Sequence, residues 1–265
     1  MIVDYQLLTT EVILLSRRVG GFIREQRQVF QFSYVEEKGL HDLVSYVDRQ
    51  AEQMLIEGLQ ALLPESGFIA EESGTKPGNK YCWIVDPLDG TTNFVHGVPV
   101  FAISIALQYL DQTVVGLVYE INLDECFYAF QGGKAMLNGV EISVSKAASL
   151  DKSLLATGFP YYDFTRLKPY MGLFAELVET SRGMRRLGSA AVDLAYVACG
   201  RFEAFYEYGL HPWDVAAGAF IVTQAGGRLS DFNGGKEVVF GKEILATNGL
   251  VHDEFLVRTA KYFGK

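Results

Sequence analysis

The chain has 265 residues, of which 49% are hydrophobic and 13% aromatic. This composition can fill a substantial core, which excludes an intrinsically disordered chain. The formal net charge is −9 and the isoelectric point is about 5.0, so a general electrostatic attraction to nucleic acid is not expected. An acidic balance still allows a phosphate substrate, because carboxylates that hold divalent cations reverse the local field.

The cysteines and the hydropathy pattern are typical of a soluble chain in a reducing compartment. Cys82, Cys126 and Cys199 are an odd, widely spaced set without a CxxC pair, and each lies in an apolar run. We expect them to be core residues rather than a disulfide framework. The N-terminus lacks a basic segment followed by an apolar run, and the longest uncharged apolar run, 98–110, is too short to span a bilayer. The expected location is the cytoplasm.

Two helices are predicted at the start of the chain. Apolar residues at helical spacing indicate a helix over 4–28. A second helix is expected from Asp42 to Leu63, where Pro64 ends it. The polar, glycine-containing stretch at 36–39 is typical of a loop between them.

Strands are predicted next. Short strands at 68–70 and 81–85 are separated by a turn-rich segment at 73–79. An antiparallel meander with tight turns is then expected, and Asn138-Gly139 marks a hairpin at its end. The strands of this meander and hairpin are 100–109, 113–120, 125–131, 135–137 and 140–144.

Strands and helices alternate in the second half, which predicts an α/β arrangement. The expected pairs are strand 154–157 with helix 163–181, strand 184–187 with helix 190–199, strand 202–206 with helix 214–225, and strand 244–247 with a final helix opened by Asn248. No low-complexity linker or repeat interrupts the chain. We therefore expect a single domain over 1–265, with a loose boundary between an α+β half (1–150) and an α/β half (151–265).

The run Asp86-Pro87-Leu88-Asp89-Gly90-Thr91 carries the strongest chemical signal. Asp86 follows an apolar strand and is expected at its carboxyl end, where open α/β sheets bind ligands. Asp89 lies on a bent loop three residues later, and the Leu88 carbonyl adds an oxygen, so the set suits Mg²⁺. The N–H groups after Gly90 begin a short helical turn that could hold a phosphate. The alternative is a plain turn, since Asp, Pro and Gly favour turns.

Three further acids could join this pair. Glu71 follows a predicted strand, Asp214 follows Trp213, and Asp48 lies on the second predicted helix. Singly, each has an ordinary explanation: a solvated loop for Glu71, a helix N-cap for Asp214 and an exposed helical position for Asp48. Their coincidence at junctions between strands and loops favours a shared cation site. The sequence has no HExxH, GxSxG, Walker or dinucleotide-binding GxGxxG motif, and its four histidines are scattered, which disfavours a zinc or histidine-centred mechanism.

These motifs resemble the inositol monophosphatase family. The family's first signature is similar to WIVDPLDGTTNF at 83–94, and its second is similar to WDVAAGA at 213–219. Further matches, in the family's order and spacing, lie at 42–48, 68–74, 188–191 and 225–227. The loop at 36–41 departs from the family pattern, and Pro212 stands where some members have cysteine. The resemblance implies a layered αβαβα sandwich of mixed α/β class and a homodimer.

The resemblance also implies a role for each matching residue. Two or three Mg²⁺ ions would be held by Glu71, Asp86, the Leu88 carbonyl, Asp89 and Asp214. The attacking water would be oriented or deprotonated by the catalytic residues Glu71, Asp48 and Thr91. The substrate would contact Asp89, Gly90, Thr91, Gly188, Ser189, Ala190, Glu207 and Asp214.

These roles predict a lithium-sensitive, Mg²⁺-dependent phosphomonoesterase. Its substrate would be a small polyol phosphate, with inositol monophosphate first, and a metal-activated water would attack in line without a covalent enzyme intermediate. Fructose 1,6-bisphosphate, NADP⁺ and adenosine 3′,5′-bisphosphate are alternative substrates for the same chemistry. A non-catalytic accessory module, as among some bacterial relatives, is a further alternative. The acidic charge argues against direct contact with nucleic acid, and no membrane partner is expected.

Overall fold

The computed structural model describes residues 3–39 and 42–264 of the chain. Its helices are α1 (Tyr5–Val29), α2 (Tyr46–Leu62), α3 (Thr91–His96), α4 (Leu167–Thr180), α5 (Ala190–Ala198), α6 (Pro212–Gln224) and α7 (His252–Phe263), with 3₁₀ turns at Phe32–Tyr34 and Leu150–Lys152. Its strands are β1 (Val35–Gly39), β2 (Asp42–Ser45), β3 (Gly67–Ala70), β4 (Gly74–Lys76), β5 (Tyr81–Asp89), β6 (Ala102–Tyr109), β7 (Gln112–Glu120), β8 (Glu125–Phe130), β9 (Met136–Leu137), β10 (Val140–Glu141), β11 (Leu154–Thr157), β12 (Gly183–Arg185), β13 (Ala204–Tyr208), β14 (Arg228–Ser230) and β15 (Glu243–Thr247).

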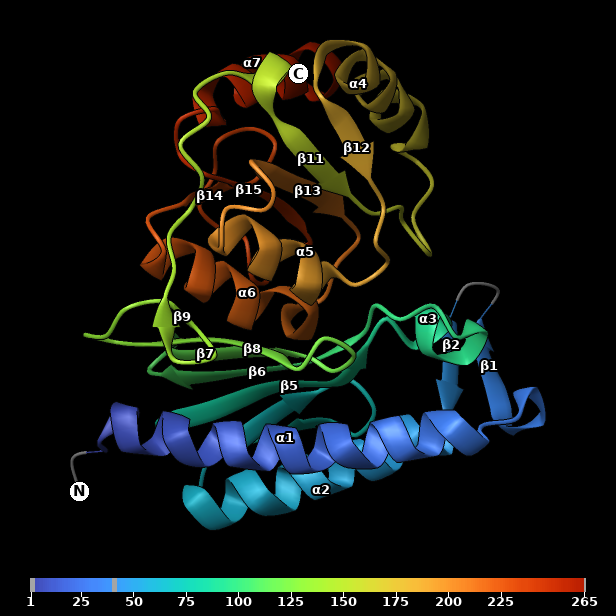
Figure 1. Cartoon of the computed structure of the whole chain (residues 1–265), viewed down its shortest axis with the longest axis vertical. Coiled ribbons are helices and arrows are strands. Elements are labelled where there is room, and N and C mark those ends of the chain that lie inside the picture. Colours follow the sequence, from blue (N-terminus) through green and yellow to red (C-terminus); the bar gives the residue numbers. More distant parts are fainter. Residues whose placement is uncertain (1–2, 40–41, 265) are drawn as a thin grey trace.

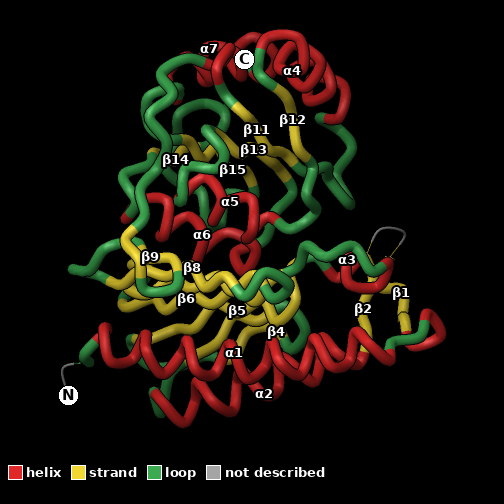
Figure 2. Tube along the Cα trace, in the orientation of Figure 1, coloured by secondary structure: helices red, strands yellow, loops and turns green. Residues whose placement is uncertain are grey.

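These elements stack in five layers (Figures 1 and 2). Helices α1 and α2 cover one face of an eight-stranded sheet with the order β10-β9-β8-β7-β6-β5-β3-β4. Helices α5 and α6 lie between that sheet and a five-stranded sheet with the order β12-β11-β13-β15-β14, and α4 and α7 cover its outer face. The predicted αβαβα sandwich of α/β class is therefore confirmed.

The strand pairing differs between the two sheets. The large sheet is antiparallel except for the parallel pair β3 and β5. In the small sheet β11 pairs in parallel with both β12 and β13, whereas β15 is antiparallel to β13 and β14. The alternation predicted for the second half is thus right in order, but only part of that sheet is parallel.

Burial on two sides explains the composition of the middle helices. Helix α5 reads AAVDLAYVA, and every residue except Tyr196 is buried. A helix that is apolar all round needs such covering, because it has no polar face for water. The helices also approach each other closely, since a Cβ at Gly218 of α6 would lie 2.5 Å from Cβ of Leu194 on α5. This middle layer places the first turns of α5 and α6 near the large sheet.

Several local predictions are wrong. The stretch at 36–39 is part of strand β1 rather than a loop, and 42–45 form strand β2 rather than the start of a helix. Helix α2 begins only after Ser45, whose hydroxyl accepts a hydrogen bond from the N–H of Val47. Strand β4 lies inside the predicted turn at 73–79, and β14 was not predicted. Leu40 and His41 of the unusual loop lie outside the described residues, as does the side chain of Lys38.

The cysteines are all free, as predicted. Cys126 is buried, but Cys82 and Cys199 are only partly buried, so the expected core position is confirmed for Cys126 alone. Within the described residues, no helix is both long and apolar enough to cross a membrane.

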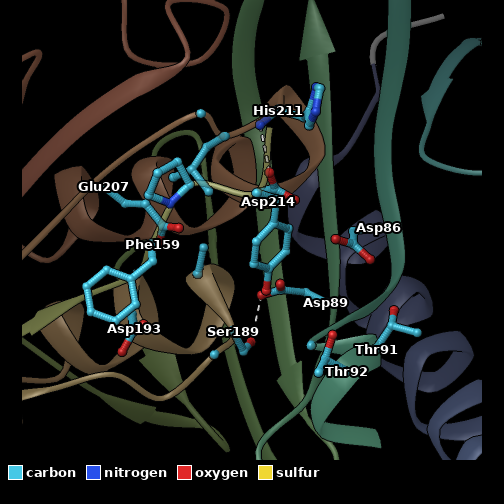
Figure 3. Close-up of a pocket in the computed structure, with 18 of the residues that line it drawn as sticks. Asp86, Asp89, Thr91, Thr92, Phe159, Ser189, Asp193, Glu207, His211 and Asp214 are labelled. Carbon is cyan, nitrogen blue, oxygen red and sulfur yellow. Dashed lines mark hydrogen bonds between the residues drawn. The ribbon is translucent and has the colours of Figure 1, made fainter. Parts of the chain in front are cut away.

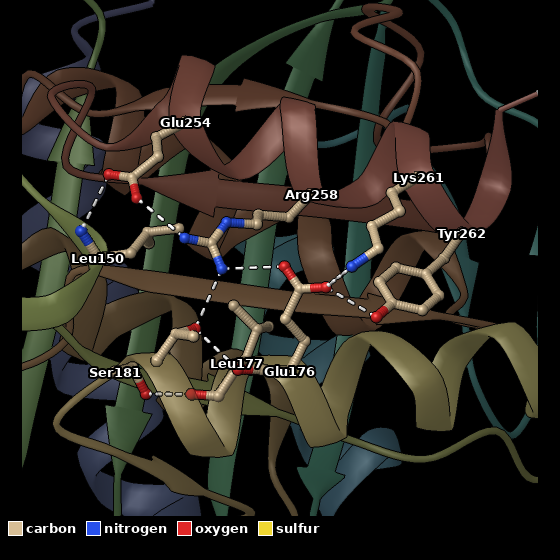
Figure 4. Close-up of polar contacts among 9 residues, drawn as sticks. Leu150, Glu176, Leu177, Ser181, Glu254, Arg258, Lys261 and Tyr262 are labelled. Carbon is tan, nitrogen blue, oxygen red and sulfur yellow. Dashed lines mark hydrogen bonds and ion pairs between the residues drawn. The ribbon is translucent and has the colours of Figure 1, made fainter.

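A polar cluster joins the two helices of the outermost layer (Figure 4). The carboxylate of Glu176 on α4 accepts from Lys261 Nζ at 2.5 Å, the Tyr262 hydroxyl at 2.7 Å and Arg258 Nη1 at 2.9 Å, all on α7. The hydrogen bond from Lys261, with those from Tyr262 and Arg258, lowers the pKa of Glu176 to about 2. The ionised carboxylate is therefore the form that the folded state favours.

We predict that Glu176→Gln lowers the free energy of unfolding by about 1–2 kcal/mol at pH 7, the range for charge-assisted hydrogen bonds at a partly exposed site. Because the folded-state pKa is depressed, this stabilisation is complete above the ordinary pKa of 4.5 and is lost as pH falls toward 2. Urea unfolding at pH 7 and pH 3 measures both effects. The matched control is Glu179→Gln, an exposed position on the same helix; equal losses in the two variants would contradict the prediction.

Candidate active site

A cavity of about 260 Å³ lies where the large sheet meets the first turns of α3, α5 and α6 (Figure 3). Among the described residues that line it, six side chains are acidic and a single arginine, Arg186, is present. The six acids are Glu71, Asp86, Asp89, Asp193, Glu207 and Asp214. Such a surplus of negative charge repels an anion unless cations are bound as well.

Three of these acids converge. Asp86, Asp89 and Asp214 can offer one carboxylate oxygen each within 4.8 Å of one another. Asp86 does not end its strand as predicted, because β5 continues to Asp89. The pairing with β6 is irregular between them: Asp86 is opposite Ser104, and Asp89 is opposite Ala102. Residues three apart on a regular strand point to opposite faces, and the extra residue of this bulge lets both carboxylates reach the same cavity.

The ionisation of this cluster is strongly perturbed. Burial, followed by the nearby charges of Glu71, Asp89 and Asp214, raises the pKa of Asp86 well above its usual range. Burial and the charge of Asp89 do the same for the pKa of Asp214, and burial raises the pKa of Asp89 to about 6. Clustered carboxylates of this kind need protons or cations to be stable. A donor set made only of oxygen atoms fits Mg²⁺.

Helix starts hold two of the acids in place. Asp89 Oδ2 accepts hydrogen bonds from the Ser189 hydroxyl at 2.6 Å and from the Ala191 N–H at 2.7 Å, at the first turn of α5. Asp214 Oδ2 accepts from the N–H of His211 at 2.6 Å, so Asp214 is in the first turn of α6 rather than at the N-cap, the ordinary explanation considered above. Carboxylates are favoured at both positions because the helix dipole is positive there.

Asp48 lies behind the cavity wall rather than in it. It is 1% exposed, which rules out the exposed position considered above. Its Oδ2 accepts from the N–H and hydroxyl of Ser45 at 2.9 and 2.7 Å, and its Oδ1 accepts from the Thr91 hydroxyl at 2.9 Å. Burial raises the pKa of Asp48. The Thr91 hydroxyl also lies 3.0 Å from the carbonyl oxygen of Leu88, so it connects Asp48 to the cavity.

Gly90 makes the turn from β5 into α3. Its φ of 95° is in the left-handed region, and an added Cβ would lie 3.0 Å from the Val100 carbonyl oxygen and 3.2 Å from that of Gly188. Only glycine adopts this positive φ readily and also lacks the Cβ for which there is little room. Gly90, Thr91 and Thr92 line the cavity at the start of α3, which no side chain caps.

Glu71 enters the cavity from the turn after β3. Its N–H donates to the Val85 carbonyl at 3.3 Å. The following N–H groups, of Glu72 and Ser73, both donate at 2.8 Å to the carboxylate of Glu52 on α2. Glu52 is buried and was missed by the sequence analysis. Its signal was available, because it lies one turn after Asp48 on the apolar face of that helix.

The residues predicted to meet the alcohol group also line the cavity. These residues are Gly188, Ser189, Ala190 and Glu207. Burial raises the pKa of Glu207 to about 8. A Cβ at Gly158 would lie 2.0 Å from Glu207 Oε2, so a glycine there makes room for the carboxylate. Every predicted site residue except Asp48 therefore lines one cavity, and the sequence analysis missed Arg186 and Asp193, which line it as well.

The chain is similar to known proteins over most of its length. The model of the inositol monophosphatase family matches residues 4–263. An inositol-1-monophosphatase of Synechocystis is 44% identical over 235 residues, 86% of this chain and 82% of that protein. A Nus factor SuhB of Pseudomonas aeruginosa is 43% identical over 239 residues, 88% of each chain.

Solved structures of two similar proteins have the same fold. The extragenic suppressor protein suhB from Bartonella henselae superposes with a TM-score of 0.91 at 35% identity, covering 96% of this chain and 99% of that one. The IMPase of Thermotoga maritima superposes with a TM-score of 0.86 at 37% identity, covering 94% of this chain and 95% of that one.

Glu52 provides a test of how the turn after β3 is held. Glu52→Gln replaces one acceptor oxygen by an NH₂ group, which leaves the N–H of either Glu72 or Ser73 without a partner. We expect a loss of about 1–2 kcal/mol in the free energy of unfolding and faster hydrogen exchange at these two amides. Urea unfolding and exchange measured by NMR provide the readouts. Glu57→Gln, an exposed position on the same helix, should change neither, and slow exchange retained in the Glu52 variant would refute this assignment.

Proposed function

Because the chain belongs to the inositol monophosphatase family, we propose that it is a Mg²⁺-dependent phosphomonoesterase of small polyol phosphates, with inositol monophosphate as the first candidate substrate. Family membership supports a phosphatase function, and the ion and the substrate are the proposed part. The observation that carries the proposal is the cavity lining of six acids and one arginine. An anionic ester can enter such a cavity only together with cations.

The acidic residues divide into ion ligands and groups that act on water or substrate. In this proposal Glu71, Asp86, the Leu88 carbonyl, Asp89 and Asp214 hold two or three Mg²⁺ ions. When bound, the ions would neutralise phosphate charge, lower the pKa of a coordinated water and stabilise the departing alkoxide. The protein's part is to hold these oxygens in place before the substrate arrives, through the bulge in β5 and the first turns of α5 and α6.

Thr91 and Asp48 would orient the attacking water. The Thr91 hydroxyl has one hydrogen, which it can donate to Asp48 Oδ1 at 2.9 Å, so its oxygen remains able to accept a hydrogen bond from water. A proton leaving the water would then be held in the pair formed by Thr91 and Asp48. The pKa of Asp48 is raised by burial, which is the direction that suits a general base.

The substrate would lie in this cavity. Its phosphate would meet the backbone of Gly90 and Thr91, and its alcohol group would meet Glu207 and the segment 188–190. Asp89 and Asp214 would contact the substrate as well. Fructose 1,6-bisphosphate, NADP⁺ and adenosine 3′,5′-bisphosphate remain alternative substrates for the same residues. We also propose that the protein is a homodimer, as the family resemblance implies, and that it is cytoplasmic, as its cysteines and hydropathy pattern indicate.

An accessory role is the second candidate function. It is favoured by the names of several relatives, since proteins called Nus factor SuhB are 40–43% identical to this chain. The acidic charge of −9 disfavours direct contact with RNA, so such a role would require a protein partner. The two functions make opposite predictions for the purified protein acting alone.

We predict that the purified protein releases phosphate from inositol 1-phosphate only when Mg²⁺ is present. EDTA should abolish the activity, Mg²⁺ should restore it and Li⁺ should inhibit it. A panel with fructose 1,6-bisphosphate, NADP⁺ and adenosine 3′,5′-bisphosphate, compared by kcat/KM, tests the substrate class. A higher value on one of the alternatives would replace the polyol, and no Mg²⁺-dependent release from any ester would favour the accessory role.

Asp89→Asn tests the ion site with little change of shape. The amide can still accept from Ser189, but the variant loses a charge that balances the cations. We expect kcat/KM to fall at least about 100-fold, equivalent to about 3 kcal/mol of transition-state stabilisation. Circular dichroism checks the fold, and Asp151→Asn, an exposed position outside the cavity, is the matched control. Turnover like that of the unmodified protein would remove Asp89 from the ion site.

A further inference from the structure

Asp193 is an acidic side chain of the cavity to which the mechanism above gives no role. It is 1% exposed, and its Oδ1 has no hydrogen-bond partner among the described residues. It nevertheless lines the cavity. Figure 3 shows it on the same side as Glu207 and Phe159, away from Asp86 and Thr91. A buried carboxyl group in a cavity wall, with one oxygen unpaired among the described residues, points to a donor supplied by a ligand.

The surroundings of Asp193 make its retention costly for folding. It is the only charged residue of α5, whose other residues are alanine, valine, leucine and tyrosine. Burial raises the pKa of Asp193 well above its usual range, and the nearby charges of Glu207 and Asp89 raise it further, while Arg186 opposes them. An apolar side chain of similar size would suit this layer better. The acid is therefore better explained by ligand binding than by folding.

The occupant facing Asp193 is not expected to be one of the cations. Among the described residues, the acids close enough to share an ion are Asp86, Asp89 and Asp214, and Asp193 is not in that set. Its neighbour is instead Glu207, from β13, whose carboxylate is accommodated by Gly158. Two acidic residues from different elements therefore line the side of the cavity where Glu207 would meet the alcohol group. Carboxylate groups bind hydroxyl groups by accepting hydrogen bonds from them.

We propose that Asp193 is a specificity-determining residue, whose carboxyl group turns from the cavity wall toward the substrate and accepts a hydrogen bond from a hydroxyl of its alcohol group beside Glu207. The assignment rests on the proposed function of the site. A substrate that carries this hydroxyl satisfies the buried oxygen, whereas an alcohol without it leaves the oxygen unpaired. For this reason, a site that forms a hydrogen bond with a substrate hydroxyl binds analogues without that hydroxyl poorly. Asp193 would thus select polyols over simple alcohols.

The test compares two esters that share a six-membered ring and differ in their hydroxyl groups, inositol 1-phosphate and cyclohexyl phosphate. The ratio of interest is kcat/KM for inositol 1-phosphate divided by kcat/KM for cyclohexyl phosphate. Asp193→Leu should lower this ratio at least about tenfold, mainly by raising KM for inositol 1-phosphate. Asp193→Asn keeps an acceptor oxygen and should retain most of the ratio. The urea midpoint of Asp193→Leu should equal or exceed that of the unmodified protein, and Asp151→Leu is the matched control. If Asp193→Leu does not fold, Asp193→Ala is measured with the same expectation for the ratio.

Two results would overturn the assignment: an unchanged ratio, as expected if the oxygen meets only water, or an equal loss on both esters, as expected of a structural role. Binding of myo-inositol, followed by saturation-transfer NMR, separates this proposal from the proposed function. If the protein hydrolyses neither ester but binds myo-inositol, and Asp193→Leu loses that binding, the phosphatase function fails and the role of Asp193 stands. If the unmodified protein neither hydrolyses these esters nor binds the polyol, both proposals fail.

Discussion

Asp86, which is buried, and the half-buried Asp89 and Asp214 bring carboxylate oxygens within 4.8 Å of one another. As anions they repel one another and lose hydration, so the surrounding chain has to compensate. Part of the compensation is visible: Asp89 accepts two hydrogen bonds from the start of α5, and Asp214 accepts one at the start of α6. The raised pKa values show that this is incomplete. The remaining charge has to be met by protons or by cations, and the proposed chemistry takes it to be met by cations.

The five-layer fold makes this crowding possible. A cavity with acids on several sides needs elements that approach it from different directions with their ends, because helix starts and strand ends offer unpaired N–H groups. The middle layer supplies two helix starts, and it stays in place because its apolar residues are covered by a sheet on each side. The large sheet supplies the bulged strand and the turn after β3. The site therefore depends on how the layers meet, which explains why its residues span the chain from Asp48 to Asp214.

Much of this arrangement was predictable from the sequence, but in an uneven way. Periodicity predicted most helices and strands, whereas the five layers and the three clustered acids followed from the family resemblance, which the signatures at 83–94 and 213–219 carry. The β1–β2 hairpin could not be predicted, because its polar, glycine-containing sequence resembles a loop and its strands depend on pairing with each other. The bulge after Asp86 was equally hidden, since it depends on the register with β6. Local patterns predict elements, whereas register and cavity lining are set by tertiary contacts.

The residues that were missed or left ambiguous share one physical feature. Asp48, Glu52 and Asp193 are acids on otherwise apolar helix faces, and all three are buried. Asp48 accepts hydrogen bonds from Ser45 and Thr91, and Glu52 accepts hydrogen bonds from the turn after β3. Asp193, in contrast, has an oxygen without a partner in the described part of the chain. An acid on an apolar face costs stability unless something pairs with it. Asp48 and Glu52 are hydrogen-bonded to groups of the protein, so a hydrogen bond from a ligand is the simplest explanation of why the chain retains Asp193.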